Sequence, residues 1–588
     1  MNPACVFCNP RAARLSALVL LTFTILLATL GSSLSGADSG PLAPPPQRVQ
    51  ADRFNPVAMP DGAIWGCSVK ALAEGRLAIT AVASTDNGRT WGTRRTLVEL
   101  PRVKPPETVW GDVVPLVDRK TGGFHAFILK WDQTDKKRPF PKLGLWHLQS
   151  PPPYARWTEP ALLFDGYIGG LLSAVQHSNG TIISPFAYMT THSYSEQAAG
   201  LGGWIFRGQH TATAVFSTDR GTHFQRSSDI NIPASILPGN ENGAIEPVCL
   251  PLKNGRVWML FRTQLGRLWE SFSPDGASWS EPRPSRFISS DSPASLTRLS
   301  DGQIVAIWNC CQRYPYAFGG RQVLHAAISA DDGRTWDGFR EVLRDPHRLA
   351  PALPIRGDYG TAYPVAAPTR DGKLVFATGQ GATSGVFLLD PAWLTAAEQR
   401  DDFANGLETW SVYGTKGVTL VPRAGHESAR VLKLERTDAE FPAGAVWNFP
   451  NGRAGTLHIR FRLLPGPAAT AITLTDHFSS PFDREAELNG LFTISVSPDA
   501  ALKDGVRVGT DRSHDLDLSW DYRNHACRAR VDGIEWKVVP QLRVISEGAN
   551  YLRFRVLSDR ATAGGILIES VEARVDRKVA AEISDVPR

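Results

Sequence analysis

A glutamate and an arginine are spaced so that one β-hairpin would bring them together. Two short apolar runs, 247–252 and 257–261, flank Asn254-Gly255. Asn-Gly between such runs favours a tight hairpin because both residues tolerate positive φ. With a two-residue turn, Glu246 would lie opposite Thr263 and Arg262 opposite Pro247. A carboxylate and a guanidinium therefore meet at the open end of the hairpin, either as a surface ion pair or as part of a site.

The second strand of this hairpin indicates what surrounds the pair. Residues 257–261 are apolar at every position, so both faces of the strand are expected to be buried. A sheet packed between two other sheets meets that requirement. A third strand is expected at 268–272, followed by a turn at Asp275-Gly276 and by Trp279 as an apolar anchor. These elements make most of a four-stranded unit.

Similar glycine turns between apolar runs occur six times along the chain. They lie at Asp61-Gly62, Thr121-Gly122, Asn179-Gly180, Asn254-Gly255, Asp301-Gly302 and Asp371-Gly372. Their spacing is near the length of a propeller blade with insertions, and one such unit alone cannot bury its apolar faces. Packing six of them around an axis would bury those faces.

A second turn pattern lies between these repeats. It runs Ser-x-Asp-x-Gly-x-Thr-Trp at 84–91 and at 329–336, and two degenerate copies lie at 217–224 and 273–279. In such a turn the Asp side chain caps nearby backbone N–H groups and the Gly takes positive φ. The closing aromatic residue is expected to pack back against its blade.

These patterns resemble the bacterial sialidases (neuraminidases), whose Asp boxes, or BNR repeats, have this form. The matching features are the four turns and the order Glu246, Gly255, Arg262. The resemblance covers about the first two thirds of the chain. It implies an all-β fold in which residues 48–398 form a six-bladed β-propeller, with the Asp boxes away from the active site.

The resemblance also implies catalytic residues. Sialic acids carry a carboxylate on the anomeric carbon that would repel a carboxylate nucleophile, and sialidases use tyrosine instead. The matching tyrosine here is Tyr363, and Glu246 would take its proton. Tyr363 on its own reads equally as a core aromatic with a bonded hydroxyl. The general acid matches Asp112 by its place after the first Asp box, whereas Asp118 reads as a turn residue.

Three arginines would grip the sugar carboxylate, since the guanidinium supplies a fork of donors that lysine lacks. Arg262 matches the middle arginine of the family and Arg321 the later one. The first is expected in an Arg-x-Pro sequence, but Arg53 stands one residue too early in Arg53-Phe54-Asn55-Pro56. This departure leaves the identity of the sugar open.

From residue 401 to 588 the pattern changes to short alternating strands, such as 456–462 and 551–556. Each of these would bury one face. They predict a β-sandwich of the concanavalin or jelly-roll kind, which either binds glycans or braces the propeller. A short helix is expected before it at 390–398, with Asp390 as N-cap and Pro391 at the first helical position.

Composition and the N-terminus narrow the function class. The net charge is +5 over 588 residues and no long Lys/Arg run occurs, so the sequence has no charge pattern typical of nucleic-acid binding. Residues 1–37 predict a secretory signal and a secreted or periplasmic protein, or, if uncleaved, a membrane anchor. Five cysteines remain after it, so at least one is expected to be free. No zinc-type spacing occurs, and neither a metal nor a cofactor is expected.

The sequence thus favours an exported exo-glycosidase that removes terminal sialic acid, or a related acidic sugar, from a glycan with retention of configuration. A propeller glycosidase for a different glycan is the alternative that the shifted Arg53 supports. A non-catalytic glycan-binding propeller is a third interpretation. It has no need for a tyrosine, a glutamate and an aspartate together. Deleting residues 402–588 is expected to leave a folded propeller.

Overall fold

The computed structural model describes residues 44–577, apart from 138–140, 191–193, 198–203, 208, 234–235, 237–242, 312–319, 347–359, 413–416, 440–442, 482–485, 499–506 and 544–546. The signal segment predicted at 1–37 lies outside the described residues. Among the residues described, no helix is long and apolar enough to cross a membrane. The chain from Pro44 onward forms one compact unit.

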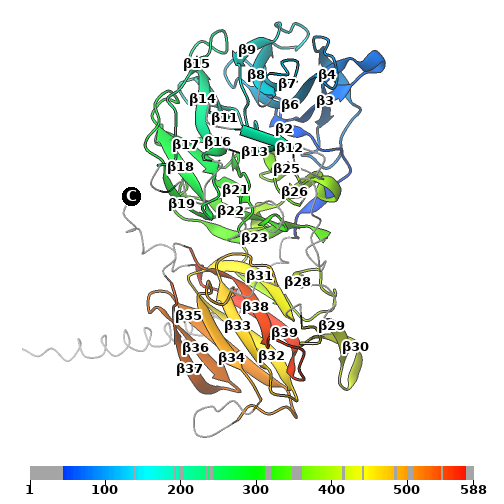
Figure 1. Ribbon diagram of the computed structural model, residues 1–588, viewed down its shortest axis with the longest axis vertical. Coiled ribbons are helices and arrows are strands. Elements are labelled where there is room, and N and C mark those ends of the chain that lie inside the picture. The colour runs from blue at the N-terminus through cyan, green and yellow to red at the C-terminus, as the bar shows by residue number, and fades with distance from the viewer. Residues whose placement is uncertain are drawn as a thin grey trace, which may run out of the picture. The chain divides into compact units, whose positions relative to one another are not determined.

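The first part of this unit consists of six antiparallel sheets of four strands each (Figure 1). In sheet order they are β2 (Asn55–Ala58), β3 (Ile64–Ala71), β4 (Leu77–Ser84) and β5 (Arg95–Glu99); β6 (Thr108–Val117), β7 (Phe124–Asp132), β8 (Lys142–Ser150) and β9 (Ala161–Phe164); β10 (Val175–Gln176), β11 (Ile182–Met189), β14 (His210–Ser217) and β15 (Gln225–Arg226); β16 (Ile245–Pro251), β17 (Val257–Arg262), β18 (Arg267–Ser273) and β19 (Arg283–Ile288); β20 (Ser295–Arg298), β21 (Ile304–Trp308), β22 (Val323–Ser329) and β23 (Asp337–Arg344); and β24 (Val365–Pro368), β25 (Leu374–Thr378), β26 (Gly385–Leu389) and β1 (Gln47–Val49). A two-stranded hairpin, β12 (Tyr194–Gln197) and β13 (Trp204–Arg207), is inserted between β11 and β14.

The N-terminal strand closes this ring of sheets. β1 supplies the outer strand of the last sheet by pairing with β26, with Gln47 opposite Leu388. Apolar clusters lie between successive sheets, and one of them joins the last sheet to the first through Val375 and Ile64. Since each sheet is covered on both faces, apolar residues fill both parities of strands such as β17. The expected six-bladed propeller is therefore confirmed.

The Asp boxes have the predicted construction. Asp86 Oδ1 accepts hydrogen bonds from the backbone of Thr90 at 2.9 Å, and Asp331 Oδ1 accepts one from Thr335 at 2.8 Å. Each box follows the third strand of its blade. Gly88 has φ of +86° and lies against Val375 of the last blade. The boxes are therefore structural turns that also pack one blade against another.

The register predicted for the Glu246 hairpin is wrong by one residue. Val248 pairs with Leu260, and the loop contains three residues, 253–255. Only Gly255 takes positive φ, because the side chain of Asn254 instead accepts a hydrogen bond from the backbone of Arg256. A bulge follows between Ile245 and Val248, so that Arg262 lies opposite Ile245.

The helix predicted at 390–398 is shorter than expected. Asp390 caps a single 3-10 turn, η5 (Pro391–Trp393), by accepting a hydrogen bond from the backbone of Ala392 at 3.0 Å. The chain then becomes extended as β27 (Glu398–Asp401), which pairs with β39 of the C-terminal sheets. The start signal was right, but pairing with a sheet replaces the later helical turns.

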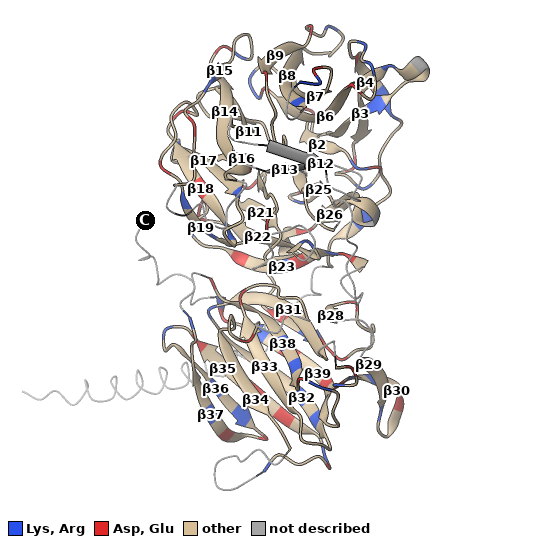
Figure 2. Ribbon diagram, viewed as in Figure 1, with Lys and Arg blue, Asp and Glu red and all other residues tan. Residues whose placement is uncertain are grey.

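The C-terminal part is the expected β-sandwich. One sheet has the order β29 (Val418–Arg423), β30 (His426–Glu435), β39 (Gly565–Val575), β32 (Ala454–Leu464), β35 (His514–Asp521), β36 (Ala526–Val531) and β37 (Ile534–Pro540), with β27 also on β39; the other has the order β28 (Trp410–Val412), β31 (Gly444–Gly452), β38 (Ala549–Leu557), β33 (Ala469–Thr475) and β34 (Phe492–Val496). Strands such as β32 alternate between buried and partly exposed residues. Their inward side chains form one large apolar core between the sheets. The outward side chains of β32 include Arg460 and Arg462, those of β35 include Asp515 and Asp517, and Arg460 pairs with Asp515. Figure 2 shows basic and acidic residues on the strands of this sheet.

We predict that Gly88→Ala destabilises the protein more than Gly372→Ala. Both glycines have similar positive φ, +86° and +78°, but a Cβ on Gly88 would lie 2.2 Å from Val375 Cγ2 while Gly372 faces open space. The backbone term of about 1–2 kcal/mol is shared, and overpacking adds about 1–3 kcal/mol at Gly88 alone. Urea unfolding of both variants measures the difference. Equal losses would show that the first Asp box does not hold the ring closed.

Candidate active site

The predicted site residues share one end of the propeller because of strand direction. In an antiparallel blade, the start of the first strand, the end of the second and the start of the third lie at the same edge. Tyr363 precedes the first strand of its blade, Arg262 ends the second strand of another, and Arg321 precedes the third strand of a third. The Asp boxes follow third strands and therefore lie at the opposite end.

Tyr363 and Glu246 are in direct contact. The Tyr363 hydroxyl donates a hydrogen bond to Glu246 Oε1 at 3.0 Å. Glu246 is buried, with 3% of its surface exposed, and Tyr363 is half-buried. Both have positive φ, +50° for Glu246 and +63° for Tyr363, a conformation that costs such residues on the order of 1–3 kcal/mol. The bulge in β16 turns Glu246 toward the phenol, which makes it a base placed to accept the phenolic proton.

Arg262 links both of these residues to a second carboxylate. Its Nη1 donates to Glu246 Oε2 at 2.8 Å and to the Tyr363 hydroxyl at 3.3 Å, and its Nε donates to Asp291 Oδ1 at 2.5 Å. Burial by itself would lower the pKa of Arg262, but Asp291 and Glu246 outweigh it and hold the pKa well above its ordinary value. Arg262 is therefore charged, and none of the described residues accepts a hydrogen bond from its Nη2.

The other two arginines also contact Tyr363. Arg53 Nη2 donates to the Tyr363 carbonyl at 3.2 Å. The guanidinium carbon of Arg321 lies 5.1 Å from the centre of the Tyr363 ring, and its Nη1 donates to Gln380 Oε1 at 3.2 Å. The one-residue shift of Arg53 in the sequence therefore does not keep it out of the site. Three guanidinium groups therefore lie around one tyrosine: Arg262 at its hydroxyl, Arg321 at its ring and Arg53 at its carbonyl.

Asp112 lies in a bulge of the first strand of its blade, between Trp110 and Val113 of β6. Its side chain is exposed. Burial lowers the pKa of Arg53, and the nearby charges of Asp112 and Tyr363 partly oppose that effect. Asp112 thus acts electrostatically on an arginine that touches Tyr363. Asp118 is instead buried in a turn, where it accepts hydrogen bonds from the backbone of Lys120 and Thr121.

Sequence reasoning missed Asp291. It lies in the loop between β19 and β20, within the polar run 289–292, all of which is buried. Asp291 Oδ2 also accepts a hydrogen bond from Gln264 Nε2 at 3.2 Å. Four consecutive polar residues read as an exposed loop, and only their burial reveals a charged partner for Arg262. In the described part of the chain no group of three His, Cys, Asp or Glu residues is arranged to hold a metal ion.

Comparison with known proteins places the chain in a family. The BNR repeat-like domain family matches residues 78–376, about half of the chain. The protein therefore belongs to the BNR repeat-like family, as its Asp boxes predicted. None of the curated proteins compared with it matches the chain.

Solved structures similar to this chain include three with low sequence identity. The Hadza microbial sialidase Hz136 has a TM-score of 0.40 and 16% identity, over 57% of this chain and 65% of that one. The Trypanosoma rangeli sialidase has a TM-score of 0.37 and 14% identity, over 90% and 93%. The intramolecular trans-sialidase from Ruminococcus gnavus has a TM-score of 0.38 and 12% identity, over 59% and 96%.

We predict that Asp291→Ala destabilises the protein by about 3–5 kcal/mol, because it leaves the buried Arg262 with one carboxylate fewer. Asp291→Asn should cost clearly less, since its amide oxygen can still accept from Arg262 Nε. Urea unfolding of the two variants measures both losses. A negligible loss in Asp291→Ala, or the same loss in both, would contradict an ion pair on which the fold of the site depends.

Proposed function

We propose that this protein is a retaining exo-glycosidase that hydrolyses terminal sialic acid, or a closely related acidic sugar, through the nucleophile Tyr363. The observation that carries the proposal is the contact of the Tyr363 hydroxyl with Glu246, within reach of three arginines. A buried carboxylate that accepts the phenolic proton is what an otherwise neutral tyrosine needs in order to attack. A purely structural tyrosine has no use for such surroundings.

The first half of the proposed reaction forms a bond from the Tyr363 oxygen to the anomeric carbon. As that bond forms, the phenolic proton passes to Glu246 Oε1, which lies 3.0 Å away. The bond from the anomeric carbon to the leaving oxygen breaks, and Asp112 protonates that oxygen. In the second half, a water molecule that loses its proton to Asp112 attacks the anomeric carbon. Tyr363 then leaves and recovers its proton from Glu246.

The arginines would serve both substrate and nucleophile. Arg262 Nη1 reaches the phenolic oxygen at 3.3 Å and would stabilise the charge that develops there. Its Nη2 donates no hydrogen bond to any of the described residues, so it can donate to a sugar carboxylate. Arg53 holds the Tyr363 carbonyl with Nη2, which leaves Nη1 for the same carboxylate. Both arginines flank one tyrosine, so a carboxylate bound between them would sit beside the nucleophile.

A second candidate is the same mechanism acting on a different glycan. Asp291 favours it, since Arg262 already pairs with two buried carboxylates, Glu246 and Asp291. A carboxylate on the substrate would meet less uncompensated positive charge than three arginines alone suggest. A neutral sugar would not be repelled by the two carboxylates and would not need that positive charge.

The test is a panel of fluorogenic glycosides, α-sialosides and neutral sugars included, assayed with the wild type and with Tyr363→Phe. The wild type is expected to turn over an α-sialoside, and the variant to lose at least about 1000-fold in kcat, because it lacks the nucleophilic oxygen. Loss of only a core hydroxyl would cost about 1 kcal/mol of stability and leave kcat intact. Glu246→Gln is the matched control for the base, and it should lower kcat while leaving the nucleophile in place.

Two outcomes would sink the proposal. If Tyr363→Phe retains most of the activity on whichever glycoside the wild type accepts, the tyrosine is not the nucleophile. If the wild type cleaves neutral sugars and ignores every sialoside, the second candidate replaces the first.

A further inference from the structure

Asn309 joins the loops that carry the site residues. It follows β21 and is fully buried. Its Nδ2 donates to the Val323 carbonyl at 2.7 Å and to Thr361 Oγ1 at 2.9 Å, and its Oδ1 accepts from Ser292 Oγ at 2.9 Å. Ser292 is the residue after Asp291, and Thr361 is two residues before Tyr363. One amide side chain therefore connects the loop that carries Asp291 to the loop that carries Tyr363.

Thr361 extends the connection to Arg321. The Thr361 hydroxyl donates to the Arg321 carbonyl at 3.0 Å, and the Thr361 backbone N–H donates to the same oxygen at 2.8 Å. The neighbouring Gly360 has φ of +96°, and a Cβ there would lie 2.5 Å from that carbonyl. The two loops therefore touch backbone to backbone, and a shift in one moves the other.

The C-terminal sandwich holds the residues next to Asn309. The backbone N–H of Phe478, which follows β33, donates to the Cys310 carbonyl at 2.9 Å. Phe478 and Cys311 also form an isolated parallel β-bridge. Both cysteines and Phe478 are fully buried. The residues that follow Asn309 are thus paired with a segment of the sandwich.

Tyr551 of the sandwich anchors the same place from a second direction. The backbone N–H of Cys310 donates to His325 Nδ1 at 3.1 Å, so in the neutral ring Nε2 carries the proton and donates to the Tyr551 hydroxyl at 2.5 Å. That hydroxyl donates in turn to Glu341 Oε1 at 2.7 Å. Burial lowers the pKa of His325 to about 4, which keeps it neutral. One sandwich hydroxyl therefore bonds to two propeller side chains, His325 and Glu341.

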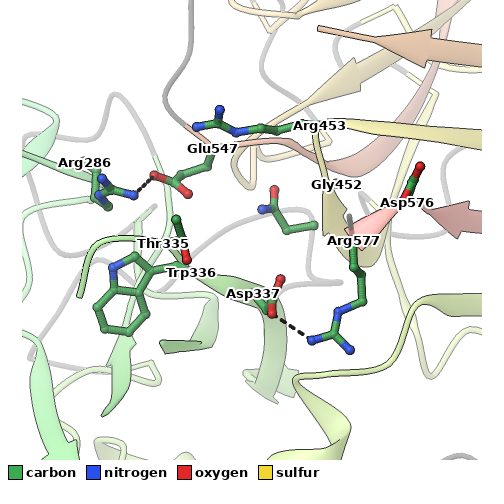
Figure 3. A pocket seen from close by; sticks show the side chains of 10 residues that line it. Arg286, Thr335, Trp336, Asp337, Gly452, Arg453, Glu547, Asp576 and Arg577 are labelled. Atoms are coloured by element: carbon green, nitrogen blue, oxygen red, sulfur yellow. Dashed lines mark hydrogen bonds and ion pairs between the residues drawn. The ribbon is translucent and has the colours of Figure 1, made fainter. Parts of the chain in front are cut away.

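Further ion pairs between propeller and sandwich lie around the hollow drawn in Figure 3. There Arg286 pairs with Glu547 at 2.8 Å and Asp337 pairs with Arg577 at 2.7 Å. None of the predicted site residues lines this hollow. These partly exposed pairs add little energy, whereas Phe478 and Tyr551 are fully buried where they contact the propeller.

We propose that the sandwich is part of the catalytic unit, with Phe478 and Tyr551 as positioning residues. They hold the segment 309–311, and through it Asn309 keeps the loops of Asp291, Arg321 and Tyr363 in register. The proposal rests on the function proposed above. It assigns the sandwich a role in the reaction that needs no glycan bound to the sandwich itself. It also implies that the propeller expressed without residues 402–588 would have a lower kcat even if it folds.

The test compares Tyr551→Phe with Tyr522→Phe. Both remove one buried tyrosine hydroxyl from the sandwich, but the Tyr522 hydroxyl makes no hydrogen bond within the described residues. Assayed on a sialoside at a temperature where circular dichroism shows each variant folded, Tyr551→Phe should lose roughly tenfold or more in kcat, since a displacement of about 1 Å can cost on the order of 100-fold. Tyr522→Phe should match the wild type. Equal kcat for Tyr551→Phe and the wild type would overturn the proposal.

A double-mutant cycle separates positioning from a general loss of stability. Thr361→Ala removes the hydroxyl between Asn309 and Arg321, and Thr361→Ser restores it. Thr361→Ala should lower kcat, Thr361→Ser should recover most of it, and Thr361→Ala combined with Tyr551→Phe should lose less than the product of the single losses, because both break one connection. Fully multiplicative losses would mean that the sandwich acts elsewhere.

A readout without substrate keeps this proposal separate from the proposed function. Cys310, Cys311 and, in the fourth blade, Cys249 form no disulfide and are fully buried. In the native protein, Tyr551→Phe should raise the rate of alkylation at Cys310 and Cys311 several-fold and leave Cys249 unchanged, while Tyr522→Phe changes none of them. If the wild type cleaves no sialoside, the proposed function fails, and the alkylation rates alone then test whether the sandwich holds the segment 309–311. Unchanged alkylation at all three cysteines would then refute the link between sandwich and site.

Discussion

The buried guanidinium of Arg262 is the constraint on which the rest of the site depends. A charge that is 8% exposed requires partners, and two carboxylates from different blade segments supply them, Glu246 at 2.8 Å and Asp291 at 2.5 Å. Each partner fixes a piece of backbone. Glu246 is held in a strained bulge of β16, and Asp291 in a buried polar loop before β20. The Tyr363 hydroxyl then bonds to the same arginine and the same glutamate.

The two ends of the propeller follow different physical rules. At one end the Asp boxes are local, since each is complete within eight residues or fewer, and they repeat with little change. At the other end the pair of Arg262 and Glu246 lies within one blade, but Tyr363 is contacted from other blades, and Arg53 from before the first strand of the first blade reaches Tyr363 in the last. The pairing of β1 with β26 closes the ring of blades and brings the start and the end of the propeller together, which makes this contact possible.

This division explains how far the sequence could be read. Local turn chemistry predicted the blades and the four boxes, and alternating strand patterns predicted the sandwich. The resemblance selected Tyr363, Glu246 and the three arginines, which the fold brings together. The hairpin register was missed because Asn254 uses its side chain rather than positive φ. Asp291 and Asn309 were missed because their partners lie 29 and 52 residues away. No local pattern marks a residue whose purpose is a contact of that span.

The most direct measurement of the central claim is the site of a covalent intermediate. A fluorosugar that carries an anomeric carboxylate and forms its glycosyl-enzyme faster than water removes it should label the wild-type protein, and peptide mapping by mass spectrometry finds the modified residue. The account predicts one label, on Tyr363, absent from Tyr363→Phe and formed more slowly in Glu246→Gln. A label on Asp112, Glu246 or Asp291 would contradict it, because the nucleophile would then be a carboxylate.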